Sequence, residues 1–95
     1  MGVELLQERR EEIRRIAAKH GAYNVRIFGS FARGDAGPQS DLDLLISVGP
    51  ETTPWFPGGL VTDLEELLGR RVDIVTDRAL SPLIRDRVLA EAISL

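Results

Sequence analysis

The chain has 95 residues, a formal net charge of −3 and no cysteine. This length predicts a single domain, residues 1–95, with a modest hydrophobic core, and the missing cysteines exclude disulfides, thiol catalysis and cysteine zinc sites. The acidic balance argues against a protein whose main task is to grip nucleic acid.

The first third of the chain alternates between helical and extended patterns. Apolar side chains recur at helical spacing over residues 3–20, and charged side chains cover the rest of that segment. Residues 24–28 alternate as in a strand, Gly29 ends that strand, and residues 30–33 are expected to form a short helix. We therefore predict a helix, a strand and one further helical turn before a polar loop.

The remaining two thirds contain two more strand patterns. Residues 42–48 and 72–76 are predicted strands, and a helix over residues 60–68 connects them. Ser81 and Pro82 are typical of a helix start, so a last helix is predicted from there to about residue 95. The order predicts an α/β (α+β) fold, a small three-stranded mixed sheet flanked by helices.

Two features bear on the location of the protein. No apolar run approaches the roughly 18 residues of a membrane span, and the first residues lack the layout of a signal peptide. We therefore expect a soluble, cytoplasmic protein.

Two aspartates give the clearest chemical signal. Asp41 and Asp43 are two residues apart at the start of a predicted strand, so both carboxylates point to the same face. Carboxylates this close repel each other unless a cation lies between them, and Mg²⁺ prefers such oxygen ligands, shared with substrate phosphates. Asp73 is isolated in an apolar strand, and it is the candidate for a third carboxylate that helps to activate a nucleophile.

The residues around the glycine turn are candidates for phosphate binding. Gly29 allows close approach of the backbone to a phosphate, Ser30 adds a hydroxyl donor, and Arg33 can neutralise phosphate charge. Ser40 either binds phosphate or caps the loop before Asp41. Each residue has an ordinary alternative when it is taken alone, such as a simple turn or a surface charge, and for Asp73 an ion pair with a neighbouring arginine. The combination and its order favour a nucleotide site.

These residues carry a resemblance to a known family. The sequence GSFARG at residues 29–34, followed by SDLDL at 40–44, resembles the signature of the polymerase-beta-like nucleotidyltransferase superfamily. The short length and the strand at residues 72–76 make the chain similar to the minimal nucleotidyltransferases, of MNT or MntA type. The resemblance implies the fold of that superfamily, triphosphate contact by Ser30, two Mg²⁺ ions held by Asp41, Asp43 and Asp73, and ATP as the donor.

The resemblance also implies a partner. Proteins of this type commonly accompany a HEPN-domain RNase toxin, act as its antitoxin and transfer AMP to a tyrosine hydroxyl of the toxin. Two alternatives stay open: an antitoxin that neutralises by binding alone, and transfer to a small molecule or an RNA end. The last helix has a second apolar stripe, at Leu89 and Ile93, which could bind a partner or another copy. Trp55 and Phe56, in an irregular loop, could stack on a base, touch a partner or cover the core.

Overall fold

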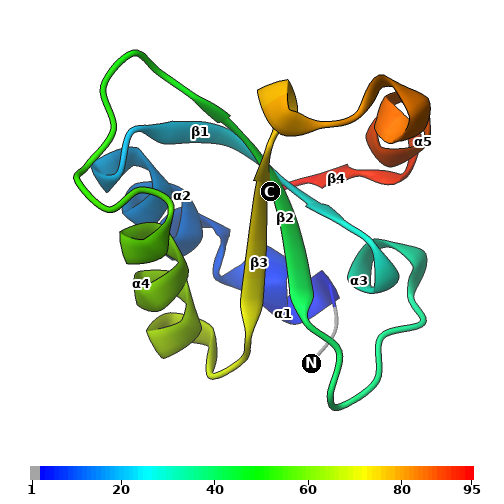
Figure 1. Ribbon diagram of the computed structural model, residues 1–95. Helices are drawn as coiled ribbons and strands as arrows, with labels where there is room; N and C mark the ends of the chain where they lie inside the picture. Colours follow the sequence, from blue (N-terminus) through cyan, green and yellow to red (C-terminus); the bar gives the residue numbers. More distant parts are fainter. Residues whose placement is uncertain (1–2) are drawn as a thin grey trace.

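The computed structural model describes residues 3–95, and its centre is a mixed four-stranded sheet (Figure 1). The strand order is β3-β2-β1-β4, where β1 is antiparallel to both of its neighbours and β2 is parallel to β3. The parallel pair needs a crossover connection, which the helix between its two strands supplies. The strands are β1 (Ala22–Phe28), β2 (Leu42–Val48), β3 (Val72–Thr76) and β4 (Ile93–Ser94).

Helices cover both faces of this sheet. The first two helices and the crossover helix lie on one face, while the last helix and a short 3-10 turn lie on the other (Figure 1). A four-residue helix follows β1 directly, at the glycine turn. The helical elements are α1 (Val3–Glu8), α2 (Arg10–Lys19), α3 (Ser30–Arg33), α4 (Gly58–Leu68), η1 (Asp77–Ala79) and α5 (Pro82–Glu91).

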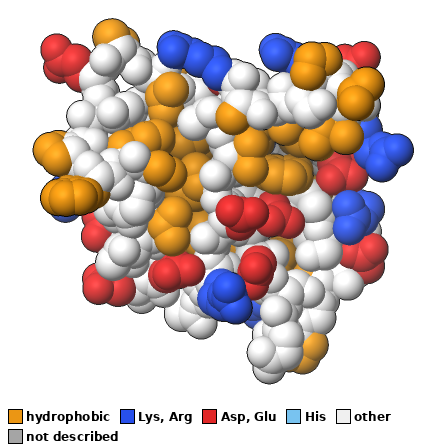
Figure 2. All heavy atoms as spheres, in the orientation of Figure 1, with side chains coloured by type: hydrophobic (Ala, Val, Ile, Leu, Met, Phe, Trp, Pro, Cys, Tyr) orange, Lys and Arg blue, Asp and Glu red, His pale blue; other side chains and the backbone are white. Residues whose placement is uncertain are grey.

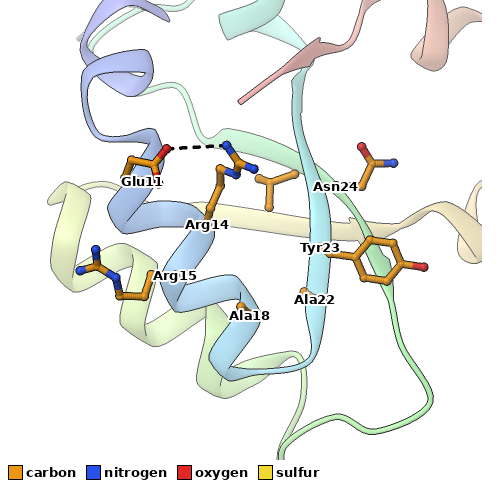
Figure 3. Close-up of a pocket in the computed structure, with 8 residues that line it drawn as sticks. Glu11, Arg14, Arg15, Ala18, Ala22, Tyr23 and Asn24 are labelled. Atoms are coloured by element: carbon orange, nitrogen blue, oxygen red, sulfur yellow. Dashed lines mark ion pairs between the residues drawn. The ribbon is translucent and has the colours of Figure 1, made fainter.

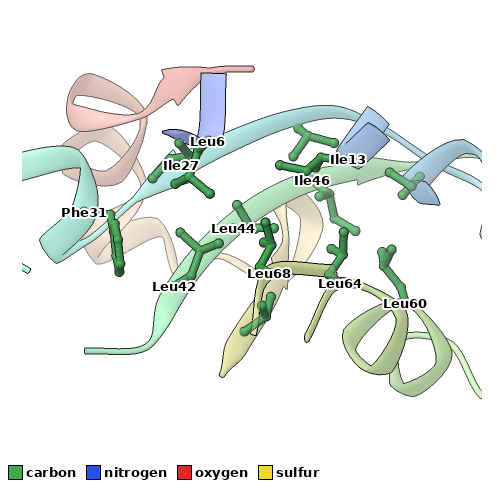
Figure 4. Close-up of a cluster of buried hydrophobic side chains, with 14 residues drawn as sticks. Leu6, Ile13, Ile27, Phe31, Leu42, Leu44, Ile46, Leu60, Leu64 and Leu68 are labelled. Carbon is green, nitrogen blue, oxygen red and sulfur yellow. The ribbon is translucent and has the colours of Figure 1, made fainter. Parts of the chain in front are cut away.

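The main core lies between the sheet and the helices α1, α2 and α4 (Figure 4). Alternate residues of β2 point into it, because strand side chains alternate between the two faces. Leucines spaced four residues apart on α4 meet them from the opposite side. The fully buried side chains of this core include Leu6, Ile13, Ile27, Leu42, Leu44, Ile46, Leu60 and Leu64.

A second, smaller core lies on the face of the sheet that carries the aspartates. Leu45 is fully buried there and packs with Leu80 and Val88, supported by Phe28 and Val75. η1 and α5 therefore close over the middle of this face, and only the end of the sheet at the start of β2 and β3 stays open to solvent.

Two sequence predictions of secondary structure were wrong. The helix predicted over residues 3–20 is two helices, α1 and α2, interrupted at Arg9. The guanidinium of Arg9 donates to the carbonyl of Leu67 over 2.8 Å, so this residue links the break to the end of α4. The sheet has four strands rather than three, because the last helix stops at Glu91 and the chain continues as β4.

β4 forms because the open edge of β1 has backbone groups to satisfy. Ile93 and Ser94 pair with Ile27 and Arg26, and the backbone N–H of Leu95 donates to the carbonyl of Val25. None of the helices within residues 3–95 combines the length and the apolar character that crossing a membrane requires.

Candidate active site

The three aspartates lie at one end of the sheet. Asp43 and Asp73 are register partners on the parallel strands β2 and β3, and Asp41 immediately precedes β2. On the other side of β2, Asp43 is paired with Phe28, the last residue before the glycine turn. Figure 2 shows acidic side chains gathered near the middle of this face, with a basic side chain beside them. The fold therefore brings together residues that are separated in sequence.

The environment of Asp43 disfavours its negative charge. Partial burial, followed by the negative charges of Asp73 and Asp41, raises the pKa of the Asp43 carboxyl above its ordinary value. Arg33 opposes this effect, whereas Glu91 adds to it. Surplus negative charge of this kind is what a bound cation or a cationic ligand group relieves.

Two features of the backbone at position 29 favour glycine there. Its φ of 75° lies in the region that L-residues rarely adopt. A Cβ atom added to its backbone would collide with the carboxylate of Asp43. The backbone of the turn therefore lies directly against the carboxylate of Asp43.

Ser30 and Arg33 are the first and last residues of α3, which leaves the turn directly. The helix ends at Gly34, whose left-handed conformation lets its N–H close onto the carbonyl of Phe31. Phe31 is buried, and the guanidinium of Arg70 lies 4.9 Å from the centre of its ring. Arg33 is exposed on the outer side of this helix.

The loop before β2 holds Ser40 in a structural role. Its hydroxyl accepts a hydrogen bond from the N–H of Gly37 over 2.8 Å, and its carbonyl accepts one from Arg70 over 2.7 Å. These bonds favour the loop-capping alternative over phosphate binding. Asp41 pairs loosely with Arg71 at 3.8 Å, and a cavity of about 230 Å³ lies beside both residues.

Asp73 is exposed, and within residues 3–95 the structure shows no ion pair between it and an arginine. Arg70 and Arg71, its neighbours in sequence, are engaged with the Ser40 carbonyl and with Asp41 instead. The ordinary alternative for this residue, an ion pair with the adjacent arginines, is therefore not supported.

The chemistry of these oxygens suits Mg²⁺, although the side chains are not gathered around one point. No group of three or more His, Cys, Asp or Glu side chains among residues 3–95 already has an arrangement that could hold a metal ion. The carboxylates of Asp41 and Asp73 are exposed, and their negative charges add to the effect of burial in raising the pKa of Asp43.

Other hollows of the surface lie away from the aspartates. One of about 360 Å³ is lined by α2 and the first half of β1, where Glu11 pairs with Arg14 and the ring of Tyr23 points away from α2 (Figure 3). Trp55 is 89% exposed in the loop that follows β2. Phe56 packs against the core.

The comparison with protein families decides the membership of the chain. The model of the family described as "Nucleotidyltransferase domain" matches residues 9–95, which include the whole of the site. The chain belongs to the nucleotidyltransferase domain family. The resemblance inferred from the glycine turn and the two aspartates is thereby confirmed.

Named relatives agree with this assignment. In Methanocaldococcus jannaschii, "Putative protein adenylyltransferase MJ0435" is 37% identical over 95% of this chain and 97% of its own length. In Thermococcus cleftensis, "Protein adenylyltransferase MntA" is 34% identical over 87% of this chain and 92% of its own. The prediction that this nucleotidyltransferase is an enzyme of the adenylyltransferase type is supported by these relatives.

Solved structures share the fold. One titled "Structure of putative minimal nucleotidyltransferase" superposes with a TM-score of 0.87 at 49% identity, over all of this chain and 97% of that one. Another, titled "Crystal structure of the toxin-antitoxin with AMP-PNP", has a TM-score of 0.74 at 19% identity over 93% of this chain and 70% of that one. The second likeness shows the fold alone. The predicted α+β nucleotidyltransferase fold is confirmed, with one strand more than expected.

The sequence reasoning missed one residue at this nucleotidyltransferase site. Glu91, the last residue of α5, accepts a hydrogen bond from the backbone N–H of Gly29 over 2.9 Å. No local pattern identifies it, because a single glutamate on a charged helix surface is ordinary. Only the pairing of β4 with β1 brings the end of α5 to the glycine turn.

Proposed function

We propose that this nucleotidyltransferase moves AMP from ATP to a hydroxyl group of a partner protein, and that it acts in this way as the antitoxin of a toxin–antitoxin pair. One observation carries the proposal: Asp41, Asp43 and Asp73 lie at the same end of the sheet, and the carboxylate of Asp43 lies directly against the turn at Gly29. Nucleotidyl transfer needs carboxylates and phosphate-binding groups in this juxtaposition.

Each residue has a role in the proposed reaction. Asp41, Asp43 and Asp73 would hold Mg²⁺, two ions in the family pattern, and the bound ions supply charge neutralisation at the triphosphate. The close approach to the backbone that Gly29 permits, together with the hydroxyl of Ser30 and the guanidinium of Arg33, would hold the phosphates, while the N–H of Gly29 itself is bonded to Glu91. Ser40 is not proposed to contact the phosphates, because its hydroxyl and its backbone hold the loop before Asp41.

The transfer itself joins the acceptor hydroxyl to the α-phosphorus. The hydroxyl oxygen forms the new bond, the bond from the α-phosphorus to the bridging oxygen breaks, and pyrophosphate leaves with the electron pair. The carboxylate of Asp73 is exposed, and in this proposal it takes the hydroxyl proton. The partner is proposed to be a HEPN-type RNase toxin, with a tyrosine as the acceptor, in the cytoplasm where ATP is available.

A second candidate function has its own observation. Leu83 is 95% exposed on α5, and Ile84 and Leu89 on the same helix are partly exposed. Exposed apolar side chains favour contact with another protein or a second copy. The stripe predicted at Leu89 and Ile93 is not formed, because α5 ends at Glu91 and Ile93 lies in β4. Neutralisation by binding alone would use this surface and leave the aspartates without a role in it.

The experiment uses ATP labelled at the α-phosphate, Mg²⁺ and the candidate toxin. We expect label on the toxin with the wild-type chain and none with Asp43→Asn, while Asp86→Asn, a change of an exposed carboxylate on α5, transfers as the wild type does. A toxin that stays unlabelled but is neutralised, and escapes neutralisation after Leu83→Asp, would establish binding alone. Label on RNA or a small molecule would refute the protein acceptor.

A further inference from the structure

One oxygen of a single carboxylate holds both ends of the helix that carries the proposed phosphate-binding residues. Oε1 of Glu91 accepts a hydrogen bond from the N–H of Gly29 over 2.9 Å, and it lies 3.5 Å from Nη1 of Arg33. Gly29 immediately precedes α3, and Arg33 is its last residue. Glu91 is 62 positions away from Gly29 in sequence, on an element of the opposite end of the chain.

Helix α3 needs such support, because four residues are too few for a stable helix on their own. On its inner side it is held by buried Phe31, against which Arg70 stacks. On the side of α5, Glu91 accepts the hydrogen bond from the turn before the helix and lies 3.5 Å from the guanidinium of its last residue, which Asp35 also approaches to 3.4 Å. The carboxylate itself is partly withdrawn from solvent, with a side-chain exposure of 22%, which strengthens a hydrogen bond to it.

We infer that Glu91 is a positioning residue of the nucleotide site, which fixes the Gly29 turn and Arg33 in the orientation that receives the triphosphate of ATP. The inference rests on the proposed function. It adds a fourth acidic residue to the site that acts through the backbone of the turn rather than through the substrate. It also makes the end of α5 part of the nucleotide site, since this helix presents Glu91.

Three substitutions separate the reach of this side chain from its charge. Glu91→Gln keeps the length and an acceptor oxygen for the Gly29 N–H, Glu91→Asp keeps the charge but is one methylene shorter, and Glu91→Ala removes both. Asp86→Ala on the same helix is the matched control, because its side chain is exposed on α5.

The first measurement is the NMR position of the Gly29 amide proton, which needs no activity. A charge-assisted hydrogen bond moves this proton downfield, so we expect it to move upfield in Glu91→Ala and Glu91→Asp and to stay near its wild-type position in the control. The second is the affinity for a non-hydrolysable ATP analogue with Mg²⁺. We expect a loss of about tenfold or more in Glu91→Ala and Glu91→Asp, and a smaller loss in Glu91→Gln.

Transfer kinetics then distinguish positioning from mere folding. A positioning role predicts a raised KM for ATP in folded Glu91→Ala, with thermal unfolding still cooperative, and partial rescue by Glu91→Gln. Wild-type affinity in folded Glu91→Ala would overturn the inference, and so would tighter nucleotide binding, which would mark Glu91 as a competitor of the phosphates. A wild-type chain that binds the analogue but transfers no AMP would overturn the proposed function and leave the role of Glu91 in binding intact.

Discussion

Asp43 and Asp73 occupy paired positions on two parallel strands, so their carboxylates lie on the same face of neighbouring backbones. Strands in such a pair are about 4.8 Å apart, and two negative charges at that spacing repel each other unless they are balanced. Partial burial, and after it this pairing, raise the pKa of the Asp43 carboxyl above that of an ordinary aspartate.

Removing the charge of Asp73 should therefore lower the pKa of Asp43. In Asp73→Asn we expect the Asp43 carboxyl to titrate at lower pH than in the wild type, as followed by carbon-detected NMR. Added Mg²⁺ should shift the wild-type titration in the same direction, because a bound cation favours the ionised carboxylate. Asp86→Asn is the control that should leave the titration in place. An Asp43 titration that responds neither to Asp73→Asn nor to Mg²⁺ would contradict this account of the site.

The two glycines that flank α3 allow the effect of backbone strain on stability to be separated from the effect of a steric collision. Both Gly29 and Gly34 have positive φ, at 75° and 82°, but only at Gly29 would a Cβ meet the carboxylate of Asp43. Gly34→Ala should cost about 1–2 kcal/mol of folding free energy, from backbone strain alone. Gly29→Ala should cost more and should also abolish nucleotide binding. Chemical denaturation and titration with an ATP analogue measure the two effects, and equal behaviour of the two variants would refute the close approach at Gly29.

Leu45 lies beneath η1 and α5 on the face of the sheet that carries the aspartates, so its substitution tests whether these two elements cover that face. It is fully buried with Leu80 and Val88, so Leu45→Ala should destabilise the protein by about 2–5 kcal/mol, as for a leucine in an ordinary core. Leu83→Ala on the exposed side of α5 should change the free energy of unfolding by less than about 0.5 kcal/mol. Denaturant unfolding of both variants provides the comparison. A harmless Leu45→Ala would mean that this face is open to solvent.

The lowered pKa of Asp77 predicts that the stability of the protein depends on pH. Its carboxylate accepts a 2.6 Å hydrogen bond from the hydroxyl of Ser47, and that bond, followed in weight by the charge of Arg26, lowers the pKa of Asp77. Because the pKa of Asp77 is lowered by folding, its ionised carboxylate contributes fully to the stability of the fold above the pKa of the unfolded chain, about 3.9. This contribution to stability is lost as the pH falls through the pKa of the folded state.

At neutral pH, the free energy of unfolding of Asp77→Asn should consequently be about 0.5–1.5 kcal/mol lower than that of the wild type, and the variant should unfold at a lower temperature. The difference should shrink as both proteins are taken below about pH 4. Thermal unfolding at a series of pH values measures this, with Asp86→Asn as the control for general charge effects. A deficit that stays constant down to acid pH would show that Asp77 acts through packing instead.

Much of the fold was accessible from local patterns, because these patterns report which face of an element is apolar. The alternation of Leu42, Leu44 and Ile46 placed β2 correctly, and the glycine after β1 marked the turn of the site. The pattern could not show that Leu45 on the other face is also buried, since that depends on where η1 and α5 pack. Nor did it show the break at Arg9, which is held by a contact with Leu67 in a distant helix.

The residues of the site also divide into those that local sequence patterns indicate and those that only the tertiary fold brings to the site. Gly29, Asp41 and Asp43 were identified because the chemistry requires those residue types at that spacing within one short segment. Asp73 was inferred from its isolation in an apolar strand, and the register with Asp43 brings it to the expected place. Glu91 reaches the site only through the β4–β1 pairing, and a two-residue strand at the end of a helical pattern has no periodicity to detect.

The strand order also has a consequence for how the molecule assembles. β4 pairs with β1, so the last strand of the chain completes the edge of the first. Contacts between residues far apart in sequence carry the largest loop-closure entropy and form slowly. The bond from Gly29 to Glu91 spans 62 positions, which puts it among the late events of folding. The turn beside the aspartates would therefore be fastened to Glu91 only after the strands that carry the aspartates have paired.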